Sequence, residues 1–516
     1  MIRPLLPLHI SEILLARTYT LKVRPSTPPW RLQRALTLCG TDESYRHATT
    51  ISTLPDDVLL EIFDFYQKNH ACNIVRACEW HILAHVCQSW RQIVLASPHR
   101  LNLQILCTHG TPVRKNLGIW PSFPIIIDHD PYPKRGITPN NEDNVIAALE
   151  HSGRVSYLRI YATESQLGKI VTAMQEPFPL LTRLEFFSLG YGNAPVLPAE
   201  FLGGSAPCLQ TIYLRSIPFP TLPTLLLSTS DLVTLQLYNI PRTGYISPEA
   251  MVVGLAALPR LETITIGFQW ATPPPDRIHS PPVTRTVLPA LISLHFRGAN
   301  EYLEDLVAQI DSPQLNQIGI NYLSQVANFR VAQLSKFIDR SVGPKLTPFR
   351  HAEVTFLNNE VSFSTYRHAN HPPSDWPPPT TTILCAGVDW QVSNIAQVLT
   401  QFSATLPNAV HLELVAEPEE DRTDDGEWLH LLHQFSTMKT LRVSRGVAGH
   451  VALALEDITG EMVAEVLPSL DLIYLPGQPA SSIEEFVAAR RLCGRPVTVI
   501  DTEKVFYDRL KSYVGE

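Results

Sequence analysis

A triplet of apolar residues with fixed spacing recurs along most of this 516-residue chain. In each copy the second apolar residue follows the first by three positions and the third follows by two more, as in Leu181, Leu184 and Phe186. The middle residues of the first seven copies are 23 to 30 positions apart. A period in this range predicts a solenoid, because one such unit can bury its apolar face only against its neighbours. The copies begin at Val155, Leu181, Leu209, Leu232, Leu261, Leu291, Leu315, Ala409, Met438 and Leu470.

Each unit predicts a short strand followed by a helix. The last two apolar residues of a triplet alternate with polar ones, as in a strand with one buried face. Helical spacing follows in segments such as Leu167, Ile170, Val171 and Met174. The fold class is therefore predicted to be a leucine-rich-repeat-like α/β solenoid with a parallel sheet over 145–516. A doubly wound α/β domain is the alternative. Prolines that stand two positions before a triplet are expected to end the preceding helix: Pro179, Pro207, Pro259, Pro289, Pro313 and Pro468.

Strand residues that lie between the buried positions should point to the concave face of this solenoid. We expect this face to bind a protein substrate. Aromatic and arginine side chains are the most frequent energetic anchors of interfaces. The predicted substrate-binding residues are Arg159, Tyr161, Tyr213, Arg215, Tyr238, Arg297 and Arg442. The same alternation predicts exposure of Glu185, Phe187, Gln236, His295, Asn321 and Glu413.

A separate helical segment precedes the repeats. Ser52 or Thr53 can cap a helix that starts near Pro55. Its apolar residues are expected on one helical face, and a second helix is predicted over 80–96. Two short helices bury little surface, so they need to pack on another domain or on a partner. The first helix carries Val58, Leu59, Ile62, Phe63 and Tyr66, and the second carries Leu83, Val86, Trp90, Ile93 and Val94.

This helical segment resembles the F-box, the motif that binds the Skp-type adaptor of cullin ubiquitin ligases. The resemblance lies in LPDDVLLEIF at 54–63 and VCQSWR at 86–91, and a polar insertion at 67–79 departs from the family pattern. The resemblance implies docking on the adaptor, and through it on a cullin ligase. The alternative is a helical hairpin that packs on its own solenoid. The implied adaptor-binding residues are Leu54, Pro55, Leu59, Ile62, Phe63, Val86, Trp90 and Ile93.

The resulting domain layout has four parts: a disordered tail over 1–50, an F-box-like domain over 51–97, a connecting segment over 98–144 and the solenoid over 145–516. The basic residues of the tail leave a mitochondrial transit peptide as an alternative. The net charge of −8 argues against a general nucleic-acid partner. Apolar runs stay below the roughly 18 residues of a membrane span. Eight scattered cysteines indicate free thiols in the cytoplasm or nucleus.

Motifs for nucleotide binding, serine hydrolysis and zinc proteolysis are missing from the sequence. Cys78, His81, His85 and Cys87 lack the spacing of a zinc site, and the acidic segment 421–432 lacks the final glutamate of a calcium loop. We therefore expect no catalytic residue, metal or cofactor. The leading hypothesis is a substrate-recognition adaptor of a ubiquitin ligase. The alternatives are a scaffold without a ubiquitin role and an enzyme with a site at the proline-rich loops 271–282 and 368–379.

Overall fold

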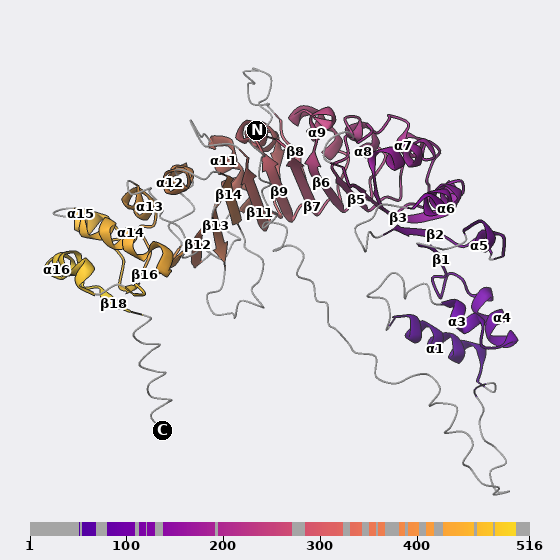
Figure 1. Ribbon diagram of the computed structural model, residues 1–516, viewed down its shortest axis with the longest axis horizontal. Helices are drawn as coiled ribbons and strands as arrows, with labels where there is room; N and C mark the ends of the chain where they lie inside the picture. Colours follow the sequence, from indigo (N-terminus) through magenta and orange to yellow (C-terminus); the bar gives the residue numbers. More distant parts are fainter. Residues whose placement is uncertain are drawn as a thin grey trace, which may run out of the picture. The chain divides into compact units, whose positions relative to one another are not determined.

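The fold is taken from a computed structural model of the whole chain (Figure 1). It describes residues 51, 54–68, 80–108, 113–119, 121–129, 138–190, 194–270, 284–323, 331–342, 350–357, 360–366, 381–386, 391–401, 409–416, 427–458, 462–477 and 480–501. The predicted tail over 1–50 and both proline-rich loops lie outside these ranges. The chain forms two compact units, Met1–Tyr66 and Gln67–Glu516. Residues 80–97, which were predicted to be part of the F-box-like domain, lie in the second unit.

The described part of the first unit is dominated by helix α1 (Asp56–Lys68), whose last residues cross the division between the units. Asp56 and Asp57 occupy its first turn, where carboxylates interact favourably with the helix dipole. Ser52 and Thr53, the predicted caps, lie outside the described residues.

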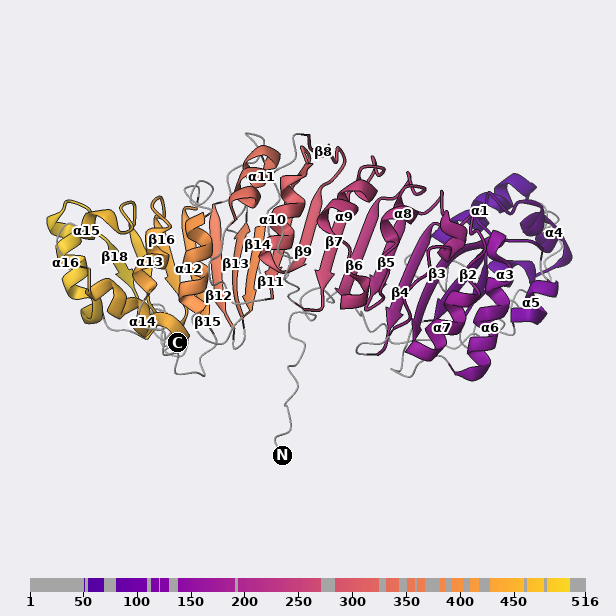
Figure 2. The same ribbon diagram turned by 90° about the horizontal axis from the view of Figure 1, so that it is seen from above.

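The second unit is built on a 16-stranded sheet in the order β1-β2-β3-β4-β5-β6-β7-β9-β11-β14-β13-β12-β15-β16-β17-β18. Figures 1 and 2 show the helices that follow β2 on one face of this sheet. From β1 to β7 the neighbours in the sheet are also neighbours in sequence, and all pair in parallel. This order excludes the doubly wound alternative, in which strand order reverses at a switch point.

The strands before the middle of the sheet are β1 (Ile105–Cys107), β2 (Ile125–His129), β3 (Val155–Ala162), β4 (Arg183–Ser188), β5 (Thr211–Arg215), β6 (Thr234–Ile240), β7 (Thr263–Phe268), β9 (Ser293–Gly298) and β11 (Gln317–Tyr322). The later strands are β12 (His351–Phe356), β13 (Glu360–Tyr366), β14 (Thr381–Ala386), β15 (His411–Ala416), β16 (Thr440–Val443), β17 (Leu472–Tyr474) and β18 (Thr498–Ile500). A small parallel pair consists of β8 (Thr286–Val287) and β10 (Ile310–Asp311).

The helices of the second unit precede the first of these strands or connect them. They are α3 (Trp80–Ala84), α4 (Gln88–Ala96), α5 (Val113–Ile119), α6 (Pro139–Leu149), α7 (Glu164–Thr172), α8 (Leu222–Leu226), α9 (Pro248–Leu255), α10 (Asn300–Ala308), α11 (Ala332–Val342), α12 (Gln391–Gln401), α13 (Trp428–His433), α14 (Arg445–Glu456), α15 (Met462–Glu465) and α16 (Glu484–Leu492).

The apolar triplets form the core between sheet and helices, as the sequence predicts. None of the thirty triplet residues is more than 4% exposed. The associated prolines have a different role from the predicted one. Pro179, for example, lies seven residues after α7 ends, inside a turn closed by a hydrogen bond from the Leu181 N–H to the Phe178 carbonyl (3.2 Å). Proline suits the second position of such a turn because its φ is already fixed.

The sheet begins earlier than the sequence predicts. Residues 98–144 were expected to connect two domains, but they contribute the strands β1 and β2. These two strands pair in parallel, and β2 also pairs in parallel with β3. Residues 125–127 on β2 are at most 5% exposed. These strands escaped the triplet pattern because their short apolar runs lack its spacing.

The parallel order is interrupted between β11 and β15. Here β13 pairs antiparallel with both β12 and β14, and β14 rather than β12 lies beside β11. The predicted parallel sheet is therefore mixed in its middle, where the triplet pattern is missing between residues 320 and 409. One continuous sheet nevertheless joins the early and late repeats through this block.

The single helix predicted over 80–96 is two helices, α3 and α4. Cys87 between them has an extended backbone, and its Sγ accepts a hydrogen bond from the Trp90 N–H (3.4 Å). Cys87 is thus an exposed helix cap. Trp80 anchors α3 to the start of the sheet: its indole N–H donates to the Gln104 carbonyl (2.7 Å) and its ring meets Phe123 edge-on.

Candidate functional site

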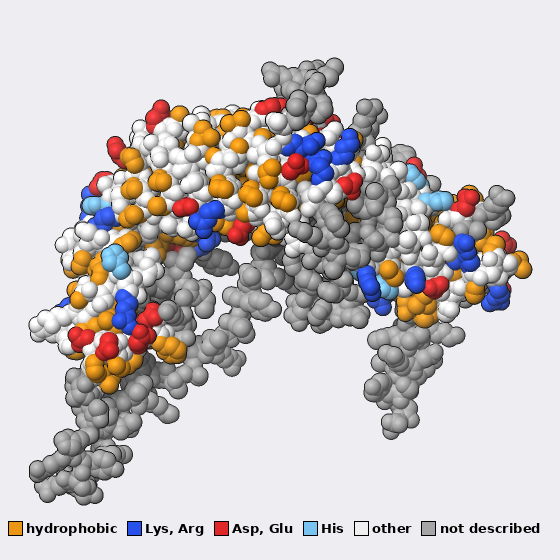
Figure 3. All heavy atoms as spheres, turned by 180° about the vertical axis from the view of Figure 1, so that it is seen from behind, with side chains coloured by type: hydrophobic (Ala, Val, Ile, Leu, Met, Phe, Trp, Pro, Cys, Tyr) orange, Lys and Arg blue, Asp and Glu red, His pale blue; other side chains and the backbone are white. Residues whose placement is uncertain are grey.

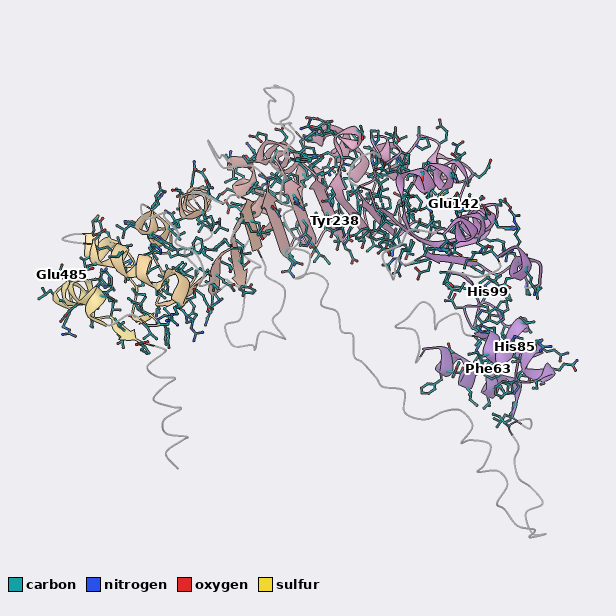
Figure 4. All side chains as sticks on the ribbon, in the orientation of Figure 1. Phe63, His85, His99, Glu142, Tyr238 and Glu485 are labelled. Atoms are coloured by element: carbon teal, nitrogen blue, oxygen red, sulfur yellow. The ribbon has the colours of Figure 1, made fainter. Side chains whose placement is uncertain are left out.

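The strand residues that point away from the helices form what we call the open face of the sheet. All seven predicted substrate-binding residues are exposed or half-buried there. Figure 4 labels Tyr238 among the strands of the sheet. Five of the seven lie on β3, β5 and β6, with β4 between β3 and β5: Arg159, Tyr161, Tyr213, Arg215 and Tyr238. Arg297 on β9 and Arg442 on β16 are apart from them, so the predicted set forms more than one cluster.

Four rings form a continuous row across β3 to β6, which we call the aromatic ladder. Tyr161 stacks on Phe187 with ring centroids 3.9 Å apart and planes 5° from parallel. Phe187 meets Tyr213 at 4.7 Å, and Tyr213 meets Tyr238 at 5.0 Å, both tilted by about 30°. Adjacent strands are spaced for such contacts, and aromatic pairs across strands stabilise a sheet.

Tyr213 and Tyr238 of the ladder remain protonated at neutral pH. Burial raises the pKa of both Tyr213 and Tyr238, and the positive charge of Arg215 opposes the rise only in part. Each phenol therefore keeps a proton that it can donate in a hydrogen bond.

Beside the ladder lies a group of charged side chains that neutralise one another. The Arg159 Nε is 3.3 Å from Asp128 and 3.5 Å from Glu185, and Arg183 also contacts Glu185. Both carboxylates are buried, with Asp128 8% and Glu185 6% exposed. The predicted exposure of Glu185 is thus wrong because two arginines cover it, and that of Phe187 (7% exposed) is wrong because Tyr161 and Tyr213 flank it.

A second cluster lies on the open face of β12 to β16, and only part of it could be found by the triplet pattern. His351 and Glu353 of β12 pair in register with His411 and Glu413 of β15, and Glu413 pairs with Arg442. The His351 Nε2 is 3.6 Å from a Glu413 carboxylate oxygen. The alternating sequence HAEVTF was the available signal for β12.

Burial, together with the charges of His411 and Arg442, lowers the pKa of His351 to about 4. Burial raises the pKa of Glu413, with Glu353 adding to the rise and Arg442 opposing it. His351 is therefore neutral at neutral pH, and its contact with Glu413 is a polar contact rather than an ion pair.

The low pKa of His351 in the folded chain predicts that the protein loses stability in mild acid. In the unfolded chain His351 binds a proton near pH 6.5, whereas in the folded chain it does so only near pH 4, so protons favour unfolding as the pH falls between these values. Between pH 7.5 and pH 5, the wild type should lose about 2 kcal/mol more of its unfolding free energy than His351→Gln. Urea unfolding at both pH values measures this. An equal loss for the two proteins would contradict the prediction, and exposed His99→Gln is the control.

The predicted adaptor-binding residues fall into two groups. In the first unit, Pro55 and Ile62 are exposed and Leu54 is half-buried, whereas Leu59 (3%) and Phe63 (0%) are buried. In the second unit, Val86 is exposed and Trp90 half-buried, whereas Ile93 is buried. The chain itself therefore covers the side chains of Leu59, Phe63 and Ile93.

Helix α1 carries apolar residues on two sides rather than on the one face predicted. Besides the buried side, it exposes Val58 (39%), Ile62 (42%) and Phe65 (68%). These three residues are spaced by four and three positions, so they form one stripe along the helix, which we call the α1 stripe. Val58 and Phe65 are not in the predicted adaptor-binding set, although their spacing from Ile62 places them on the same side of a helix.

Other chemistry is sparse in the described ranges. Within them no group of three or more His, Cys, Asp or Glu residues is placed to hold a metal ion. None of the helices there has the length and apolar character needed to cross a membrane. On the side shown in Figure 3, basic and acidic side chains of the described residues are interspersed.

Comparisons with known proteins find little similarity in sequence or structure. No family model matches the chain, and no curated protein matches it. Among solved structures, the leucine-rich repeat-containing protein LegL7 from Legionella pneumophila is similar over 77% of this chain and 99% of its own, with 13% identity and a TM-score of 0.25. The chain's own strand order and buried triplets define it as a mixed α/β repeat protein with a large, mostly parallel sheet.

Proposed function

We propose that this protein is the substrate-recognition subunit of a Skp/cullin/F-box-type ubiquitin ligase. In this proposal the N-terminal segment docks on the Skp-type adaptor, and the open face of the sheet holds a protein substrate. The observation that carries it is the α1 stripe, which lies in the segment with the F-box-like sequence. The chain would supply no catalytic residue, metal or cofactor, and would act by raising the local concentration of the substrate near the ubiquitin-charged enzyme.

The α1 stripe is unusual for a short surface helix. A helix of a soluble protein normally buries one apolar side and exposes a polar one. Here three large apolar side chains remain exposed within thirteen residues, in addition to the buried side. Such a helix is expected to be covered on both sides, and a partner with an apolar groove would cover the second.

The test is binding of a purified Skp-type adaptor to the full chain. Ile62→Glu combined with Phe65→Glu should weaken binding at least about tenfold, because two carboxylates would have to enter an apolar contact. Both side chains are exposed, so the thermal unfolding of the chain should not change. The matched control is Val253→Glu, which alters a side chain that is 60% exposed on α9. If the wild type does not bind the adaptor at about 10 µM, the ligase function is to be abandoned.

A scaffold without a ubiquitin role is the second candidate. The contacts of Trp80 with Gln104 and Phe123 favour it, because they make α3 an N-terminal cap of the sheet, as in a helical hairpin packed on its own solenoid. For a scaffold, the α1 variants would leave all partner binding unchanged. For the ligase subunit, they would remove the adaptor and leave substrate binding intact.

A further inference from the structure

The large sheet has two joints at which strands from distant parts of the sequence pair with each other. β11 pairs with β14, and β12 pairs with β15 although β13, β14 and α12 lie between them in the sequence. In a repeat array each unit is stabilised mainly by its neighbours, so the array can open at one place while the units on either side stay folded. We call the pairing of β12 with β15 the late joint, because it connects the antiparallel block to β15–β18.

Two histidines lie side by side on the open face of the late joint. His351 of β12 and His411 of β15 are partners in the parallel register, so the spacing of neighbouring strands separates their backbones. His351 is 8% exposed, and His411 is half-buried. The other joint pairs no titratable side chains on the open face, where its partners are Gly319 with Thr382 and Asn321 with Leu384.

Charged and titratable groups surround the histidine pair. The His351 Nε2 is 3.6 Å from a Glu413 carboxylate oxygen, and the ring centroids of His351 and Tyr366 are 5.9 Å apart. Burial and the positive charge of Arg350 lower the pKa of His411. In the described part of the chain, the surrounding groups are Arg350 directly before β12, Glu353 on β12, Tyr366 on β13, Glu413 on β15 and Arg442 on β16.

Acid would place like charges across this joint. Both histidines are neutral at neutral pH, and their protonation would put two positive charges next to each other. Like charges on directly opposite residues of neighbouring strands destabilise the pairing of those strands. The Glu413 carboxylate would compensate little, because burial raises its pKa and it therefore takes up a proton in mild acid.

From the register of the two histidines, their burial and the groups around them, we infer that the late joint is an acid-sensitive opening in the sheet. In mild acid β12 separates from β15, while the strands on either side keep their pairing. This conformational device goes beyond the proposed function and does not depend on it.

The size of the effect follows from the proton uptake of the opened joint. Opening exposes His351 to water, so its pKa returns from about 4 to the ordinary value of 6.5. Between pH 7.5 and pH 5, this difference alone raises the opening equilibrium about 30-fold. Glu413 acts in the opposite direction, because its raised pKa favours the closed joint in acid. We therefore expect a net increase of about tenfold.

Hydrogen exchange of the full chain at pH 7.5 and pH 5 tests this, with correction for the intrinsic exchange rates. In segments 351–356 and 411–416, the amides that bond across the late joint should lose protection about tenfold; one of them is the His411 N–H, which donates to the Arg350 carbonyl (2.9 Å). Amides that bond across the other joint, in segments 317–322 and 381–386, should change by less than about twofold.

Two histidine variants connect the opening to its cause. In His351→Gln the loss of protection at the late joint should shrink to less than about threefold, because the side chain with the largest difference in proton affinity is gone. His411→Gln removes the half-buried member of the pair and should reduce the loss in the same direction. Exposed His99→Gln is the control and should behave as the wild type.

Three results would overturn the inference. The first is unchanged protection of the late joint at pH 5. The second is a loss spread evenly over all strands, which would mean global unfolding instead of opening at one joint. The third is a loss of the wild-type size in both His351→Gln and His411→Gln.

Discussion

Replacing Phe186 by alanine is expected to lower the unfolding free energy of the second unit by about 3–5 kcal/mol, the usual range for a buried phenylalanine. Phe186 is fully buried on the helix-covered face of β4 and meets Phe201, which in turn meets Phe219. The cavity would thus open in a row of rings that joins consecutive repeats. Urea unfolding followed by circular dichroism measures the loss.

Hydrogen exchange should locate this loss. In a repeat array each unit contacts mainly its neighbours, so protection should fall most in β3 to β5 and least near β17. Leu180→Ala is the control, because Leu180 is 45% exposed and its truncation should change stability by less than about 0.5 kcal/mol. A loss of similar size for both variants, or one spread evenly over the sheet, would contradict the prediction.

Replacing Arg490 by alanine is expected to destabilise the C-terminal end of the sheet by about 2–4 kcal/mol. Arg490 on α16 is 1% exposed, and its guanidinium donates to the carbonyls of Leu470 (2.9 Å) and Val463 (3.4 Å). Its removal leaves a cavity and two carbonyls that lose these charged donors. The midpoint of urea unfolding measures the effect.

Arg491→Ala is the matched control for Arg490, since it removes the same charge from the next position, which is exposed. It should change stability by no more than about 0.5 kcal/mol. Equal effects of the two variants would mean that net charge, rather than the buried hydrogen bonds, stabilises this end of the sheet.

The repeats were predictable because their signal is periodic burial, which a sequence displays directly. All ten triplets lie in the core, and ten strands follow from them. The strands β12 to β14 were not predictable in the same way. Their pairing depends on which strands come together in space, and β14 rather than β12 lies beside β11.

The candidate site was predictable at the level of single residues. Alternation identified Tyr161, Tyr213 and Tyr238, but not their joining into one ladder through the buried Phe187. The covering of Glu185 by arginines likewise depends on contacts between neighbouring strands. On α1, helical periodicity did not separate the exposed side from the buried side. Each exposed position, 58 or 62, is followed directly by a buried one, 59 or 63, so the two sides lie close together around the helix.

The antiparallel block in the middle of the sheet has a consequence for the direction of the later repeats. β14 is parallel to β11, and β12 is parallel to β15. The strands of the late repeats therefore run in the same direction as those of the early repeats, although β12, β13 and β14 lie between them. They can do so because β13 reverses direction once on each side. An even number of such reversals preserves direction and an odd number inverts it. Loss of β13 and β14 together would therefore be compatible with the helices staying on one face, whereas loss of one strand alone would turn every later right-handed crossover to the opposite face.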